Sequence, residues 1–570
     1  MMQMKRNLTL SLFILSALCS MAQNEDKSIA LGEVVVKAAK TVNKMDGMVI
    51  YPTDVQKKSS SNGYDILQKL SLPNIKIDAA SHQVSAADNK GEVQVRINGI
   101  VVGRQEMLSL DPKSIARIDF INNPGVRYGD NIAYVIDITT RRADNGYTIG
   151  TDITATLTSR QGDGTAYGKW NKGKSELSLS YEFSGYKLKG MRNEERADYT
   201  LNDGNIYTIS RNDIATQRKQ LGHDIKLTYN WMDSTTCVFQ ASLSGSFYRT
   251  PGNYNIKDIY DSGNHYTATS RESGNNSSPV ADLYFFRQLT PRQSITANAV
   301  GTYISTKSSN YYDEGTPYLY DVNGKSASIL SEIIYENRLK PFTLSTGLNY
   351  RFKHIKNDYT GDAAALTEIN NSTTYAFGEI KGMIRAWQYS FGAGASYIHY
   401  RQDTHSYNYW TFRSKVNLAY DLMQGMQLSY SFQMSDRVSQ IAMINDATIR
   451  NNCMEWTVGN PNLKPNRDLE HTMQLAYNNA RLQTNLNVYY KHCIKPNMAL
   501  YERTNDNRFI YTQINQKAID VLQSYGYASY WIVPEKLQVT AYGGLYRCFN
   551  FGNDYTHCYT SWFYASCLLY

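Results

Sequence analysis

From Tyr147 to the end of the chain, apolar and polar residues alternate with a period of two. Representative segments are residues 177–183, 225–229, 344–350, 412–418 and 482–489. Such alternation places the apolar side chains on one face of a β-strand. We expect the strands that contain these segments to be about ten residues long, the length that a tilted strand needs to cross the hydrocarbon layer of a membrane. The pattern therefore predicts membrane-crossing strands over residues 146–570.

The connections between these strands alternate between short and long. The short ones are residues 232–236, 289–292, 338–341, 386–388, 421–425 and 533–536, and long polar ones are residues 187–222, 250–278, 353–371 and 435–467. Tight periplasmic turns alternating with large outer loops are typical of outer-membrane barrels. A soluble β-sandwich does not require short and long connections to alternate. Lipid offers the backbone no hydrogen-bond partners, so we expect the strands, about eighteen by counting up and down, to close on themselves.

Residues 41–145 show a mixed pattern that predicts a small α/β domain. Ile66, Leu67 and Leu70 share a helical face, and a proline follows three residues later. Asp111 precedes a proline in the arrangement that begins a short helix. Alternating residues predict strands at 93–97, 118–121 and 134–139.

The first 22 residues have the features of an export signal. Lys5 and Arg6 precede an apolar run from Leu8 to Leu18, and a small-residue cleavage site ends at Ala22. A lipoprotein signal at Cys19 is the alternative, and the bulky Leu18 before it disfavours that interpretation. Residues 23–40 then form an N-terminal segment ahead of the α/β domain.

Composition narrows the function further. The chain has 570 residues, a mean hydropathy of −0.48 and 46 tyrosines, which fits a strand-rich protein better than a bundle of membrane helices. The net charge of +8 comes from interspersed residues, so no basic block suggests nucleic-acid binding. The six cysteines after the leader have no CxxC spacing and give no disulfide framework.

No motif in the sequence indicates catalysis or a cofactor. The nine histidines are scattered without metal-ligand spacing, and no phosphate-binding loop or nucleophile elbow is present. We therefore expect a protein without enzymatic activity, cofactor or resident metal.

Three groups of motifs carry a resemblance to a known family, the TonB-dependent receptors of Gram-negative outer membranes. Residues 31–38 resemble the segment that opens these proteins, and Glu33, Val34, Val35 and Val36 are the TonB-box candidate, with a Val-rich plug strand as the equal alternative. Two plug motifs are similar to the family's central strand and closing turn: Arg96, Asn98 and Gly99, then Pro124, Gly125, Arg127, Tyr128 and Gly129. An outer-loop motif follows at Gly459, Asn460, Pro461, Asn462, Leu463, Lys464 and Pro465, with Asn466 where Glu is usual.

The resemblance implies a large antiparallel transmembrane β-barrel whose lumen holds residues 41–145 as a plug. Such receptors have about 22 strands, so either this barrel is smaller or the chain is incomplete at its C-terminus. The implied function is import of a scarce large ligand (a chelated metal, glycan or peptide) across the outer membrane. TonB, lipid and a surface lipoprotein are the implied partners.

Two further expectations stay open at this point. Arg96, Arg104 and Arg127 are candidates to pair with acidic residues of the lumen, or they are solvated. Tyrosines in the outer segments suit ring stacking on a ligand or contact with a protein. A non-transporting surface or assembly protein that binds a protein partner is the alternative function.

Overall fold

A computed structural model describes residues 40–570 apart from residues 45–46, 71, 73–74, 79–81, 87–90, 123, 129–131, 142–144, 157, 234–235, 403–404, 440–447, 480, 534–536 and 570. Residues 39–570 belong to one compact unit. The predicted signal peptide and TonB-box candidate lie outside the described residues. No helix among those described is both long and apolar enough to span a bilayer.

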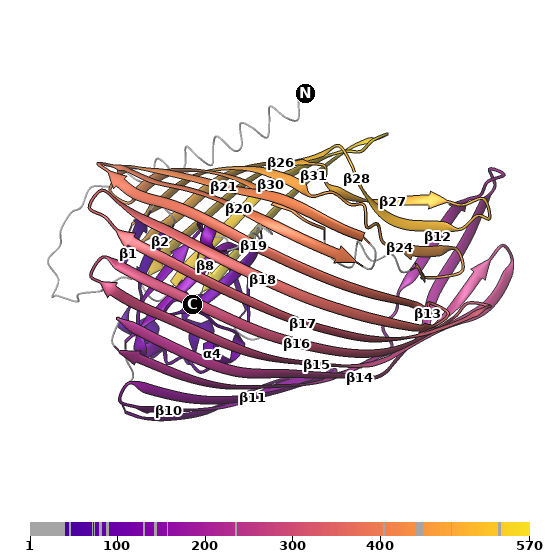
Figure 1. The fold of residues 1–570 in the computed structure, drawn as a ribbon, viewed down its shortest axis with the longest axis horizontal. Coiled ribbons are helices and arrows are strands. Elements are labelled where there is room, and N and C mark those ends of the chain that lie inside the picture. Colours follow the sequence, from indigo (N-terminus) through magenta and orange to yellow (C-terminus); the bar gives the residue numbers. More distant parts are fainter. Residues whose placement is uncertain are drawn as a thin grey trace. The chain divides into compact units, whose positions relative to one another are not determined.

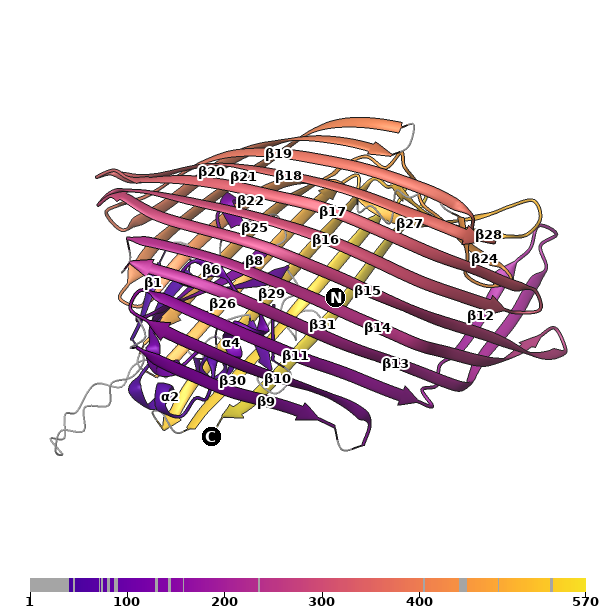
Figure 2. The same cartoon turned by 60° about the horizontal axis from the view of Figure 1, so that its bottom comes forward.

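Most of the chain forms a closed antiparallel barrel of 19 strands (Figures 1 and 2). In chain order they are β9 (Gly146–Ala155), β10 (Arg160–Lys172), β11 (Ser175–Lys189), β12 (Glu194–Thr200), β13 (Ile206–Asp233), β14 (Cys237–Asp261), β15 (Asn264–Thr290), β16 (Gln293–Asp313), β17 (Pro317–Arg338), β18 (Phe342–Gly361), β19 (Ala365–Ile384), β20 (Trp387–Gln402), β21 (His405–Met423), β22 (Met426–Arg437), β25 (Asn466–Asn478), β26 (Leu482–Ile494), β29 (Ala518–Val533), β30 (Leu537–Phe551) and β31 (Thr556–Leu569). The predicted barrel is confirmed, and its size is near the expected eighteen strands. The extra strand is β12, which is short and pairs only with residues 206–212 at the beginning of β13. Strand β11 pairs with residues 217–231 of β13.

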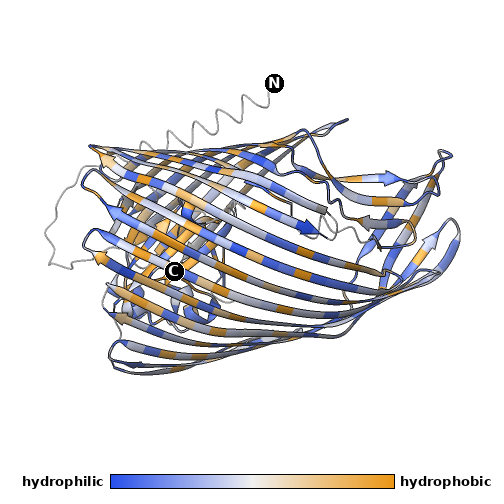
Figure 3. Cartoon of the chain, in the orientation of Figure 1, coloured by the Kyte–Doolittle hydropathy of each residue, from blue (hydrophilic) through white to orange (hydrophobic). Residues whose placement is uncertain are grey.

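Alternation along the strands separates two faces of the wall. On β17 and β18 the outward residues Ile329, Ile333 and Leu348 are 47%, 45% and 47% exposed, whereas their neighbours along each strand face the lumen. Figure 3 shows the resulting alternation of apolar and polar bands along the wall. Apolar side chains that face outward contact acyl chains instead of water, which accounts for their exposure in the isolated chain.

The long connections predicted as loops are mostly further β-structure. Strand β13 is 28 residues long, and β14 and β15 continue as a hairpin to Asp261 and Asn264. Bulges between Asp213 and Ala215 and between Thr250 and Asn253 interrupt the ladder without ending it. Backbone pairing does not require apolar side chains, so strands continue beyond the lipid wherever a partner strand continues too.

The plug contains a six-stranded sheet in the order β1-β2-β7-β8-β5-β6, together with short helices. The strands are β1 (Lys40–Lys44), β2 (Gly47–Tyr51), β5 (Glu92–Ile97), β6 (Ile100–Val101), β7 (Ile115–Ile121) and β8 (Ile132–Thr140), and β3 (Ile75–Asp78) pairs with β4 (Gln83–Ala86). The helices are α2 (Asp54–Lys58), α3 (Gly63–Leu70) and α4 (Arg104–Leu108), with 3-10 turns η1 (Pro112–Ser114) and η2 (Val126–Tyr128).

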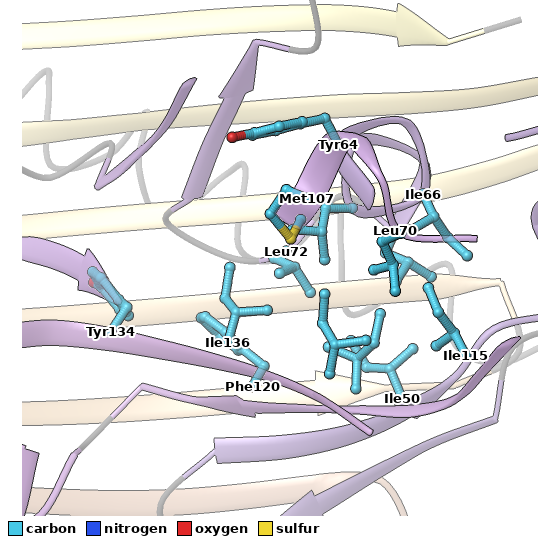
Figure 4. Packing of buried hydrophobic residues seen from close by; sticks show 14 of the residues in the cluster. Ile50, Tyr64, Ile66, Leu70, Leu72, Met107, Ile115, Phe120, Tyr134 and Ile136 are labelled. Atoms are coloured by element: carbon cyan, nitrogen blue, oxygen red, sulfur yellow. The ribbon is translucent and has the colours of Figure 1, made fainter. Parts of the chain in front are cut away.

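An apolar core holds the plug together (Figure 4). Ile66 and Leu67 of α3 are fully buried, and they pack with Ile115 and Ile118 of β7 and with Ile136 of β8. Burying such side chains stabilises the plug by about 1.5–3 kcal/mol each. The predicted helical face at residues 66–70 is therefore the inner face of α3.

A second sheet lies in the connections at the long-loop end of the barrel. It consists of β23 (Thr448–Arg450), β24 (Glu455–Val458), β28 (Phe509–Asn515) and β27 (Asn497–Arg503), in that order. We call these four strands the outer sheet. Its two halves come from the connections that precede β25 and β29, so the sheet joins two segments far apart in sequence.

Candidate functional site

The closing turn of the plug is held by the barrel wall, in an arrangement that we call the clamp. Glu379 of β19 accepts a hydrogen bond from the backbone N–H of Val126 (3.2 Å), and Arg413 of β21 donates one to the carbonyl of Val126 (3.1 Å). Lys415 of β21 donates to the carbonyl of Pro124. Val126 is 2% exposed, so these backbone groups have little access to water and depend on the wall for partners. The clamp thus fixes residues 124–126 against β19 and β21.

A second attachment joins the plug to β10 and β11. Arg104 at the start of α4 forms ion pairs with Asp163 of β10 and, at 2.8 Å, with Glu182 of β11. Glu106 of the same helix pairs with Lys226 of β13. Burial raises the pKa of the Glu106 carboxyl, but the charge and hydrogen bond of Lys226, together with backbone hydrogen bonds, outweigh burial, so the net pKa lies below its usual value.

Between these attachments lies a cavity of about 800 Å³, lined by both plug and wall. The plug supplies Arg96, Arg127 and Asp137 to it, and the wall supplies Tyr284, Asn298 of β16 and Glu332 of β17 among others. Several wall residues of the cavity, such as Ser294 and Arg338, lie next to the short turns. The cavity is therefore at the end of the barrel that the short turns identify as periplasmic.

Arginines and a tyrosine of the plug motifs meet at this cavity. The guanidinium groups of Arg96 and Arg127 lie 4.9 and 4.7 Å from the ring centre of Tyr128. Arg127 also pairs with Glu336 of β17 at 3.6 Å. Arg96 instead bonds Gln94 (2.7 Å) and the carbonyl of Gly99 (3.1 Å), so the predicted pairing with a lumen acid holds for Arg104 and Arg127 and is not formed by Arg96 among the described residues.

The turn at Asn98 and Gly99 explains why these residue types are needed. Both have positive φ values, 53° and 82°, which Asn and Gly adopt most readily. The side chain of Asn98 bonds Thr140 on β8, and the N–H of Gly99 donates to Asp137 at 3.0 Å. Burial raises the pKa of the Asp137 carboxyl, and the bond from Gly99 and the charge of Arg96 oppose this in part.

The predicted outer-loop motif anchors the outer sheet to the barrel. Leu463 is 3% exposed and packs on Ile355, Ile369 and Tyr400 of the wall. Asn460 donates to the carbonyl of Gln513 in β28 (3.0 Å), and the N–H of Lys464 donates to Asn515 (2.8 Å). This motif lies at the other end of the barrel from the plug motifs, so the two groups do not form one site.

A buried ion pair stabilises the outer end. Arg211 of β13 is 2% exposed and pairs with Glu314 at 2.8 Å, and Glu314 accepts from the N–H of Cys453 at 2.7 Å. The tip of the β12–β13 hairpin also bonds the tip of the β27–β28 hairpin through Asn202 and Asn507 (2.7 Å). Sequence patterns did not reveal this cluster, because its members are more than a hundred residues apart.

The tyrosines of the outer segments do not share one surface. Tyr260 is 49% exposed and stacks on His265, whereas Tyr312 is partly buried and donates to Glu314 (2.7 Å). Gly129, like the TonB-box candidate, lies outside the described residues. Pro124, Gly125 and Tyr128 are at the clamp and the cavity as described above.

One group of possible metal ligands was not foreseen from the sequence. A ligand atom from each of His82, Asp152 and Asp163 lies within 4.8 Å of the others. Arg104 donates to both His82 (2.9 Å) and Asp163, so its guanidinium already supplies positive charge there. The group is best described as part of the second attachment of the plug.

Known proteins share this architecture. Residues 290–555 match the family model described as the outer membrane protein beta-barrel family. The copper transporter OprC superposes with a TM-score of 0.58 at 13% identity, over 91% of this chain and 81% of that one. A mutant ferric enterobactin receptor (PfeA) from Pseudomonas aeruginosa, in complex with enterobactin, gives 0.53 at 11% identity, over 90% and 86%.

The FrpB iron transporter from Neisseria meningitidis (F5-1 variant) gives a TM-score of 0.53 at 12% identity, over 87% of this chain and 78% of that chain. Among curated proteins, none matches the sequence. At these identities, the structural matches establish the fold. Part of the barrel, residues 290–555, thus matches an outer-membrane β-barrel family, and the chain as a whole has the fold of the named transporters, in agreement with its resemblance to the TonB-dependent receptors.

Proposed function

We propose that this protein is a receptor that imports a scarce large ligand across the outer membrane by TonB-driven movement of its plug. The observation that carries the proposal is the plug itself, which is attached to two parts of the wall and borders a cavity between them. A barrel of this size would otherwise enclose an aqueous channel. A barrel that served only as a membrane anchor would not need a plug in its lumen.

The cavity suggests where the path opens. Glu379, Arg413 and Arg104 hold the plug on the sides of β19, β21 and β10–β11. The wall from β14 to β17 borders the cavity instead. A pull on the N-terminal segment would therefore displace the plug most easily on the cavity side.

The ligand class is a chelated metal, a glycan or a peptide, and chelated metal is the first to test. The named structures of similar fold transport copper or iron or bind ferric enterobactin, which supports this order of testing. The proposal also includes four domains: a signal peptide at residues 1–22, a TonB-binding segment at 23–40, the plug at 41–145 and the barrel at 146–570.

Deleting residues 28–37 tests TonB coupling. We expect uptake of radiolabelled ferric chelates, oligosaccharides or peptides at nanomolar concentration to fall to the level of cells lacking the protein. Surface binding of the same probe should be unchanged, and the heat-dependent gel shift of a folded barrel should persist. Unchanged uptake with a folded barrel would contradict the proposal.

The alternative is a non-transporting surface or assembly protein that binds a protein partner. The outer sheet favours it, because β27 is an edge strand whose Tyr501 is 59% exposed. It predicts a stable partner complex and no energy-dependent uptake of any probe. Tyr501→Ala would then weaken the complex, whereas deletion of residues 28–37 would leave it intact.

A further inference from the structure

Four wall strands place polar side chains in one row on the lumen face, next to the second attachment of the plug. Asp152 of β9 lies opposite Thr165 of β10, which lies opposite Glu182 of β11 on its other side. Glu182 in turn lies opposite Asp224 of β13. Alternation assigns the row to the lumen, because the residue after Asp152, Ile153, is 80% exposed on the outward face. We call these four residues the acidic row.

The acidic row carries more negative charge than the ion pairs around it balance. Together with Asp163 of β10, it has four carboxylates. Arg104 of α4 pairs with Asp163 and Glu182, but it brings only one positive charge. Lys226 of β13 is paired with Glu106 of α4, so those two charges cancel. Like charges that lie directly opposite each other, as two carboxylates of the row do, destabilise a sheet. The described ion pairs thus leave room for a further cation.

Two oxygen atoms of the row have no hydrogen-bond partner in the described part of the chain. They are the hydroxyl oxygen of Thr165, a residue that is 2% exposed, and Oδ1 of Asp152. The Nε2 atom of His82 approaches Oδ1 of Asp152 only to 3.5 Å, which is long for a hydrogen bond. Nearly all buried polar atoms in proteins have a partner, so these two oxygens indicate a bound group beside them.

The carboxylates converge closely enough to share one ion. An oxygen of Asp163 lies within 4.8 Å of an oxygen of Asp152. Two oxygens bound to the same Ca²⁺, each at about 2.3–2.6 Å from it, lie at most about 5 Å apart. Thr165 shares the lumen face of β10 with Asp163 and is directly opposite Asp152. Three oxygen donors on two adjacent strands therefore surround one position.

The donor set favours calcium over other divalent cations. Arg104 donates to Nδ1 of His82 (2.9 Å), and because a guanidinium has only donors, the proton of the neutral imidazole is on Nε2. His82 therefore offers no lone pair to zinc. Mg²⁺ requires a near-ideal octahedron at about 2.0–2.1 Å, whereas Ca²⁺ accepts irregular sets of about six to eight oxygens.

We propose that the acidic row binds a calcium ion, held by carboxylate oxygens of Asp152 and Asp163 and by the hydroxyl of Thr165. Glu182 lies opposite Thr165 on the other side and supplies a further carboxylate, and water completes the shell. The ion balances the excess charge while Arg104 keeps its ion pairs, so calcium strengthens the second attachment of the plug. This proposal holds whether or not the plug transports a ligand.

The test measures binding of radioactive Ca²⁺ to the full chain by equilibrium dialysis in detergent. Outer-membrane lipid is removed first, because its phosphates also bind Ca²⁺. Asp152→Asn removes a charged ligand, and Asp358→Asn removes the same charge from an exposed position on β18. Thr165→Val removes the hydroxyl without changing the charge, and Thr165→Ser keeps it. Mg²⁺ is the competing probe.

We expect the native chain to bind one Ca²⁺, and Asp152→Asn and Thr165→Val each to lower the affinity at least tenfold, because each removes a ligand. Asp358→Asn and Thr165→Ser should change it less than twofold, and an equal concentration of Mg²⁺ should not displace the ion. A native chain that binds Ca²⁺ no more tightly than Asp152→Asn would overturn the proposal. So would equal affinities of Thr165→Val and Thr165→Ser, or displacement by Mg²⁺, since either indicates only diffuse attraction to acidic residues. Heat-dependent gel mobility confirms that each variant is folded.

Discussion

The two flanks of the plug meet the wall in different ways. Toward β19 and β21, the wall supplies hydrogen-bond partners to the buried backbone of residues 124–126. Toward β14 to β17, the plug and wall border a cavity instead, and the ion pair that crosses to the wall there is that of Arg127 with Glu336, at 3.6 Å. A gate that opens repeatedly needs one side that holds and one that yields. In the proposed mechanism, the cavity flank is therefore the side that we expect to move.

Filling the cavity should have the largest effect on transport. Asn298 faces the cavity, and its side-chain oxygen has no hydrogen-bond partner in the described part of the chain. We expect Asn298→Trp to reduce uptake of the imported ligand at least tenfold without weakening ligand binding at the cell surface.

The matched control is Ala299→Trp, which adds the same side chain one residue further along β16. Ala299 lies opposite Leu283, which is 50% exposed on the outward face, so the new ring would face lipid. Uptake at the native level is expected for this control. Equal uptake by both variants would remove the cavity from the transport path.

Breaking the clamp should loosen the other flank. Glu379→Ala leaves the buried N–H of Val126 without its acceptor, a loss of roughly 1–3 kcal/mol. We expect hydrogen exchange at Val126 to speed up by about tenfold to a hundredfold, as that energy implies, while exchange in the plug core stays slow. Glu379→Gln keeps an acceptor oxygen and should lie near the native rate. The same acceleration in the core would show that the clamp stabilises the whole plug.

The smallest effect concerns pH and Asp137 beside the cavity. Its pKa is raised by burial, so ionisation disfavours the folded plug, and the stability present at low pH decreases as pH rises through that pKa. Asp137→Asn stays neutral and keeps an oxygen for the Gly99 N–H. The native plug should therefore lose protection from hydrogen exchange as the pH rises above about 4, the ordinary pKa of an aspartate, and the variant should lose less. A pH dependence that is the same in both chains would rule out this role for Asp137.

Much of the fold could be predicted from the sequence because every wall strand obeys the same constraint, an apolar face toward lipid and a polar face toward the lumen. Period-two alternation identified the wall strands, and the turn at Asn98 and Gly99 identified part of the plug. The outer sheet and the continuation of β13 to β15 could not be predicted, since polar strands outside lipid carry no apolar signal.

The site was harder to foresee than the fold. The sequence singled out Arg127 and the Pro124–Gly125 turn, but Glu336, which pairs with Arg127, and Lys415, which donates to the carbonyl of Pro124, lie more than two hundred residues away. Which wall residues meet the plug depends on the register and tilt of the closed barrel. No local pattern encodes that, and the same holds for Arg211 with Glu314.

The central claim is that the plug closes an otherwise open barrel, and ionic conductance in planar lipid bilayers tests it most directly. The full chain should give almost no steady conductance. A chain lacking residues 41–140, shown to be folded by its heat-dependent gel mobility, should give large and lasting open channels. A full chain that conducts as well as the shortened one, or a folded shortened chain that stays closed, would contradict the account.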